Sequence, residues 1–265
     1  PRRSGFLLGL YYGGTGLGIV LSALLVPPLL QAAAQRPHAW AWAWWGLALA
    51  CLLATALMVW PARVLARQPA PSASPQAGGG RQFRVRDFMF SLAGYAAFGV
   101  GYIGYMTFVI ALLRDQGSGP GAITAFYALL GVAVLASSRI WAGLLDRHRD
   151  GQALARLNAL LGVAAIVPAL TGSWPLLLAS GLLFGGVFLS VVASTTALVR
   201  HNLPPAQWAA GISAFTTVFA AGQIVGPTVV GFIADGPGGL ARGLVFSAAA
   251  LWVGAALAAK QKALA

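Results

Sequence analysis

The chain has 265 residues, of which 58% are hydrophobic and only 8% charged, and none of them is glutamate. Soluble domains average about 25% charged residues, so this composition excludes an ordinary soluble domain. The net charge of +12 would suggest a nucleic-acid partner in a soluble protein, but the placement of the charges gives another explanation. Cys51 is the single cysteine, which rules out an intrachain disulfide. We expect no metal or cofactor, because the three histidines lie in different joints.

Eight apolar stretches are separated by short polar joints. A helix needs about 20 apolar residues to cross the hydrocarbon core of a bilayer, and these stretches meet or approach that length. The sequence therefore predicts an all-α polytopic membrane protein. The predicted spans are residues 6–30, 40–60, 88–113, 122–145, 153–170, 174–199, 208–234 and 240–259.

The basic residues follow the alternation of these spans. If the first span starts inside, the outside joints hold only Arg36, Arg114 and Arg242, and the remaining 14 of the 17 basic residues fall inside. Short cytoplasmic loops carry such an excess because basic residues resist translocation. We therefore expect both termini of the chain to be cytoplasmic and no nucleic-acid partner.

One joint, residues 62–87, is rich in Pro, Ala, Ser and Gly and ends in the basic segment 81–86. This composition predicts a flexible linker that separates two spans from six. We expect the basic segment to lie along the lipid headgroups, with Phe83 and Phe88 reaching into the membrane. A dedicated lipid-binding site is the alternative.

The spans are of two kinds. Those at 40–60, 153–170 and 240–259 are apolar nearly all round and can face lipid, whereas the other five carry polar side chains that need a partner or water. We expect the polar-lined spans to form the interior and the plain ones the periphery. The candidate residues along a substrate path are Tyr12, Thr15, Tyr95, Tyr102, Tyr105, Tyr127, Ser190, Thr216 and Gln223.

Two of these features have alternative explanations. Tyr95, Tyr102 and Tyr105 share one helix face, where they could hold a small ligand or form hydrogen bonds between spans. Gln223 is taken as the only Asn or Gln well inside a span, and its partner is substrate, water or another helix.

Glycines at four-residue spacing predict close helix packing, with rocking between helices as the alternative. They include Gly14 and Gly18 in the first span and Gly222 and Gly226 in the seventh, where Pro227 predicts a kink. The segment from Gly99 to Gly104 also matches a dinucleotide-binding fingerprint, but it lies in the middle of a span, and so we reject that function.

The segment 221–235 looks like helix 11 of the major facilitator superfamily, and segments 5–18 and 99–108 look like the bacterial YbfB/YjiJ-type permeases. The chain as a whole resembles this superfamily, whose members have two six-helix halves joined by a cytoplasmic loop. The resemblance implies the last two helices of the N-terminal half in 1–61, the linker in 62–87 and a complete C-terminal half in 88–265. The chain would then be a fragment covering helices 5–12.

Gly143, Asp146 and Arg147 are similar to the cytoplasmic loop signature that the superfamily carries between helices 8 and 9, although Ala142 stands where a glycine is usual. The resemblance implies a secondary transporter of the bacterial inner membrane that moves a small organic solute by alternating access. The Tyr, Thr and Gln side chains indicate a neutral or mixed solute. We expect a monomer in the lipid bilayer, with a proton as the candidate coupling ion.

No Asp or Glu lies in the middle of a span, so a coupling acid is expected outside this chain, or this half does not couple protons. Two other classes of protein are alternatives. A complete eight-span channel or assembly subunit fits poorly with a division into two spans and six. A membrane-embedded enzyme would need a nucleophile and a base, and the nearest pair is Ser213 with His201; we therefore predict no catalytic residue.

Overall fold

A computed structural model describes residues 4–67 and 81–264, with side chains described from Tyr11 onward except for Ser138. The described residues form helices and short joints without a strand, which confirms the predicted all-α membrane fold. Eight described helices are long and apolar enough to cross a membrane.

The eight long helices follow the predicted spans closely, and two short 3₁₀ helices, η1 (Val85–Phe88) and η2 (Pro205–Gln207), precede α3 and α7. The long helices are α1 (Ser4–Ala32), α2 (Ala39–Ala66), α3 (Met89–Asp115), α4 (Pro120–Arg147), α5 (Gln152–Leu170), α6 (Trp174–Asn202), α7 (Trp208–Ala234) and α8 (Gly239–Ala258). Arg2, Arg3 and the linker residues 68–80 lie outside the described residues.

The chain divides into two compact units. Pro1–Val20 and Arg81–Ala265 form the larger unit, and Leu21–Gly80 form the smaller one. In the smaller unit, the most apolar window of α2 has no buried residue, as expected for a plain span that faces lipid. The division at 1–61, 62–87 and 88–265 stays a prediction.

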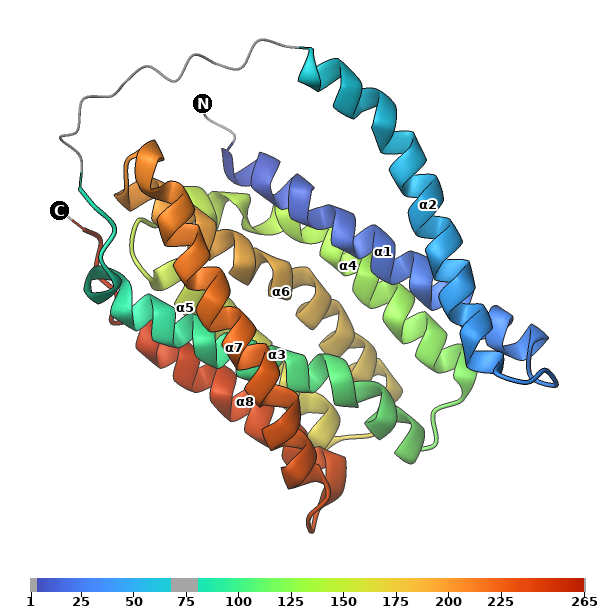
Figure 1. Cartoon of the computed structure of the whole chain (residues 1–265). Helices are drawn as coiled ribbons and strands as arrows, with labels where there is room; N and C mark the ends of the chain where they lie inside the picture. The colour runs from blue at the N-terminus through green and yellow to red at the C-terminus, as the bar shows by residue number, and fades with distance from the viewer. Residues whose placement is uncertain (1–3, 68–80, 265) are drawn as a thin grey trace. The chain divides into compact units, whose positions relative to one another are not determined.

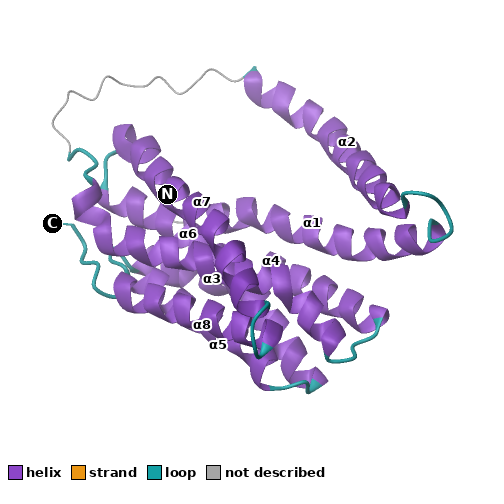
Figure 2. Cartoon of the chain, turned by 60° about the horizontal axis from the view of Figure 1, so that its bottom comes forward, coloured by secondary structure: helices purple, strands orange, loops and turns teal. Residues whose placement is uncertain are grey.

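Helix α3 lies between α7 and α8 in the larger unit (Figures 1 and 2). Its glycines allow a close approach on both sides. A Cβ built on Gly99 would lie 2.7 Å from the carbonyl oxygen of Phe219 in α7, and one on Gly101 would lie 2.6 Å from that of Ser247 in α8. The glycines that imitate a nucleotide-binding motif therefore serve helix packing.

Helix α7 returns this contact with its own glycines. A Cβ on Gly222 would lie 2.6 Å from the carbonyl oxygen of Ala96, and one on Gly226 would lie 2.7 Å from that of Val100. Both neighbours are backbone atoms of α3. The packing contacts predicted for Gly222 and Gly226 are therefore present between α3 and α7.

The plain spans are not all peripheral. Helix α5 packs against α8, α6 and α3, and 56% of its most apolar window is buried. The corresponding share for α7 is 17%, although α7 carries polar side chains. The expected order is thus wrong for α5, because small residues such as Ala164 and Ala165 let neighbouring helices surround it.

The basic segment is anchored on protein. Phe88 is fully buried, with its ring centroid 5.6 Å from that of Phe83 and 6.1 Å from that of Phe215 in α7. The backbone N–H of Phe83 donates to Oε1 of Gln207 at 3.1 Å. The prediction that Phe88 reaches into lipid is wrong, because the rings of Phe83 and Phe215 offer it apolar partners within the protein.

Residues 259–264 continue from α8 and fasten this end of the larger unit. The buried side chain of Gln261 accepts a hydrogen bond from the N–H of Ser91 at 3.3 Å and donates one to the carbonyl of Asp87 at 2.9 Å. The N–H of Gly151 donates to the backbone carbonyl of Gln261 at 3.1 Å. We call these contacts the Gln261 clasp; they join the starts of α3 and α5 to the end of α8.

The contact between α3 and α7 predicts the effect of one added methyl group. Gly222→Ala should lower the free energy of unfolding by about 1–3 kcal/mol, because the methyl group meets backbone that cannot rotate away. The thermal midpoint in detergent measures this. Gly143→Ala is the control, since open space surrounds Gly143 and alanine favours the helix. A Gly222→Ala protein that melts at or above the parent temperature would contradict the prediction.

Candidate functional site

An aromatic cluster joins three helices of the larger unit. It consists of Tyr95, Phe98 and Tyr102 of α3, Phe188 of α6 and Phe219 of α7. Offsets of three and four residues place the α3 members on one face. The ring of Tyr102 lies 4.8 Å from that of Phe98, 5.4 Å from that of Phe219 and 6.1 Å from that of Phe188, all stacked.

A single amide stands beside this cluster. Nε2 of Gln223 in α7 donates a hydrogen bond to the hydroxyl of Tyr102 in α3, so of the three partners considered for Gln223 the structure shows another helix. Among the described residues, nothing bonds to Oε1 of Gln223. Gln223 is half-buried and Tyr102 is 9% exposed. The pair therefore presents an acceptor next to stacked aromatic faces.

Tyr105 points toward α6, whereas Tyr102 points toward α7. Tyr105 is fully buried, and its hydroxyl lies 2.8 Å from Oγ of Ser180 in α6. Because Ser180 donates its own proton to the carbonyl of Ala164 in α5, the Tyr105 hydroxyl donates to Ser180. Tyr127 likewise donates to the carbonyl of Met106 at 3.2 Å. For these two tyrosines the structure shows hydrogen bonds between helices.

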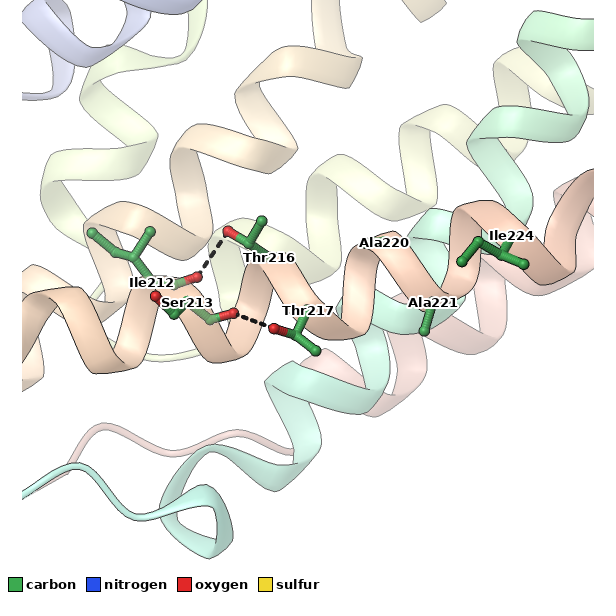
Figure 3. Close-up of a pocket in the computed structure, with 7 residues that line it drawn as sticks. All are labelled: Ile212, Ser213, Thr216, Thr217, Ala220, Ala221 and Ile224. Atoms are coloured by element: carbon green, nitrogen blue, oxygen red, sulfur yellow. Dashed lines mark hydrogen bonds between the residues drawn. The ribbon is translucent and has the colours of Figure 1, made fainter.

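An open, shallow pocket of about 590 Å³ lies along an exposed face of α7, and Figure 3 shows the residues that line it. All seven described residues along it belong to α7, and Thr216 and Thr217 supply hydroxyl groups. Each hydroxyl donates to the carbonyl four residues earlier, at 2.9 Å. Both threonine hydroxyls thereby donate their protons within the helix, and among the described residues no donor bonds to their oxygen atoms.

The remaining path candidates are dispersed. Tyr12 is half-buried against the core of the larger unit, Thr15 is exposed, and Ser190 is buried in α6. No described atom lies within 4 Å of a Cβ built on Gly14 or Gly18.

The close approach of α1 runs instead through Gly16, which the four-residue spacing skipped. A Cβ on Gly16 would lie 2.7 Å from the carbonyl oxygen of Gly131 in α4. The packing of α1 on α4 thus depends on a glycine between the two that the sequence singled out.

The loop-signature residues end α4. Gly143, Asp146 and Arg147 are exposed, and no described ion pair involves Asp146. His201 binds the carbonyl of His148 through Nδ1 at 3.1 Å, and the described contacts include no hydrogen bond from His201 to Ser213. Within the described residues, no group of three or more His, Cys, Asp or Glu side chains could share a metal ion.

Sequence reasoning missed Asn158. It lies in α5, fully buried, and Nδ2 donates to the carbonyl of Gly94 in α3 at 3.3 Å. Treating the span 153–170 as apolar throughout, and Gln223 as the only amide well inside a span, was therefore wrong. The signal was available, because an Asn six residues into an apolar helix needs a polar partner.

The fold and these contacts define a multi-pass α-helical membrane protein with an uncharged aromatic and amide cluster. Residues 1–259 match the family described as "Uncharacterised MFS-type transporter YbfB". The chain belongs to this family of major facilitator transporters, which confirms the resemblance and indicates a transporter, not an enzyme.

The chain is also similar to the multi-drug resistance efflux pump PmrA of Streptococcus pneumoniae serotype 4 (strain ATCC BAA-334 / TIGR4). The two are 31% identical over 120 residues, which cover 42% of this chain and 29% of the pump. PmrA of Streptococcus pneumoniae strain ATCC BAA-255 / R6 matches with the same identity and coverage. The match thus spans less than a third of these relatives.

The hydrogen bond of Tyr105 predicts a loss of stability on its removal. Tyr105→Phe should lower the free energy of unfolding by about 0.5–1.5 kcal/mol, because the bond to Ser180 is buried and water cannot replace it. Thermal unfolding in detergent measures the loss. Tyr11→Phe removes a hydroxyl from a side chain that is 79% exposed, and it should leave the midpoint unchanged. Equal losses in both variants would refute a specific role for the Tyr105 bond.

Proposed function

We propose that this transporter moves a small, flat, aromatic organic solute across the bacterial inner membrane by alternating access. The observation that carries the proposal is the Tyr102–Gln223 pair within the aromatic cluster. Stacked rings recognise a planar apolar ligand through its faces. One free amide oxygen can accept a hydrogen bond from the ligand and fix its orientation.

Charge argues for an uncharged solute. All five acidic residues, Asp87, Asp115, Asp146, Asp150 and Asp235, lie at or beyond the ends of described helices. A cationic ligand held deep in a span would need a compensating acid nearby, because an isolated charge in low dielectric is costly. None of these five acidic residues is a sequence neighbour of a residue of the aromatic cluster.

The outer face of α7 extends the candidate path. Thr216 lies one heptad before Gln223, so its hydroxyl oxygen follows the amide along nearly the same side of the helix. The similarity to a multi-drug efflux pump favours an organic, drug-like solute.

We place both termini of this chain in the cytoplasm, on the basis of the basic joints. Residues 88–265 belong to the C-terminal half, and the protein acts as a monomer. A proton is the proposed coupling ion, and no acid in the middle of a described span accepts it.

A dye accumulation assay tests the function. Cells expressing the protein should differ from vector cells in the rate at which Nile red, a flat uncharged dye, enters or leaves. Gln223→Leu and Tyr102→Phe should each raise the half-saturating dye concentration about 2–10-fold, as expected for one lost hydrogen bond.

Tyr105→Phe is the matched control, because it removes a tyrosine hydroxyl from the same helix without altering the Tyr102–Gln223 pair. Its half-saturating dye concentration should equal that of the parent. The proposed solute class is wrong if the protein leaves Nile red movement unchanged but alters that of radiolabelled methyl glucoside, an uncharged solute without an aromatic ring.

A further inference from the structure

Four basic side chains remain uncompensated at the end of the larger unit that carries the Gln261 clasp. They are Arg84, Arg86, Lys260 and Lys262, and all four are exposed. None of them takes part in an ion pair or a side-chain hydrogen bond within the described part of the chain. By contrast, Arg81 is paired with Asp87 at 3.3 Å.

The Gln261 clasp brings the two basic pairs together. Lys260 and Lys262 flank Gln261, whose side chain binds the carbonyl of Asp87, the residue after Arg86. The four cations therefore occupy one region, although they are far apart in sequence. Self-repulsion at such a cluster is relieved by a bound anion.

The backbone that carries the two arginines is held in place. The N–H of Asp87 donates to the carbonyl of Arg84 at 3.0 Å, closing the turn between them. Phe83 is fixed by Gln207 and by stacking on Phe88. An anion that binds here meets charges on an ordered segment and does not have to order a loop first.

Exposed apolar side chains adjoin these charges. Val85 lies between the two arginines and is 60% exposed, while Met89 and Phe90 at the start of α3 are 51% and 38% exposed. These residues begin a membrane span. A soluble anion gains nothing from contact with apolar side chains, whereas a phospholipid can pack its acyl chains against them.

We propose that Arg84, Arg86, Lys260 and Lys262 form a binding site for the headgroup of an anionic phospholipid, with its acyl chains against Val85, Met89 and Phe90. The phosphate accepts hydrogen bonds from the two guanidinium groups, and the two ammonium groups balance its negative charge. This site is separate from the aromatic cluster and does not depend on the proposed transport function.

Lipid-dependent thermal stability of the detergent-purified protein tests the site. Because a ligand that binds only the folded state stabilises it, added phosphatidylglycerol should raise the thermal midpoint above that reached with phosphatidylcholine. Arg84→Gln/Arg86→Gln and Lys260→Gln/Lys262→Gln should each weaken the apparent affinity for phosphatidylglycerol by about tenfold or more. Arg114→Gln/Arg242→Gln removes the same charge from joints at the opposite end and should keep the parent affinity.

Three results would overturn the site. Phosphatidylglycerol could stabilise the parent no more than phosphatidylcholine does. The Arg114→Gln/Arg242→Gln protein could lose as much affinity as the site variants, which would reduce the effect to net charge. Finally, glycerol 3-phosphate, the headgroup chemistry without acyl chains, could stabilise the protein as well as the lipid at the same concentration, which would make the ligand a soluble anion.

Discussion

The approach of backbone to backbone around α3 is the constraint on which the larger unit depends. Lipid tails are as apolar as the helices, so hydrophobic burial drives helices together weakly and close packing must do so. Gly99 and Gly222 bring α3 against α7, and Gly101 brings it against α8. Only at this separation can Gln223 reach the hydroxyl of Tyr102 and the ring of Phe219 stack between its α3 neighbours. The candidate site is therefore a product of the packing.

Two tyrosines of helix α3 consequently have different roles. Tyr105 ties α3 to α6 and α5 through a buried chain of hydroxyl groups, and it serves stability. Tyr102, three residues earlier, turns toward α7, where its hydroxyl accepts a hydrogen bond from Gln223. A difference of three residues leaves the two side chains about 60° apart around the helix, and this is enough to give them different partner helices.

The sequence predicts the spans well because hydrocarbon thickness sets a minimum length of apolar helix, and prolines and glycines mark the joints. It predicts which residues share a helix face, but it does not say which helix lies opposite. For this reason the sequence does not distinguish Tyr95, Tyr102 and Tyr105 from one another. It also predicts a lipid environment for Phe88, whose partner in the structure is Phe215. Asn158 was overlooked because an average over the span conceals one polar side chain. The sequence does not predict that Lys260 and Lys262 lie near Arg84 and Arg86. This proximity depends on the side chain of Gln261, which binds the backbone at the start of a helix far away in the sequence.

The Gln261 clasp also has a consequence for the order of assembly. The N–H of Ser91 donates to Oε1 of Gln261, which lies 170 residues further along the chain and is synthesised later. Ribosomes add about 5–20 residues per second, so roughly 10–30 s separate the synthesis of the two partners. During that interval the start of α3 and the start of α5 lack the contact that later joins them. This end of the bundle therefore closes late, and the membrane in which the chain is inserted meets the exposed arginines before the lysines arrive.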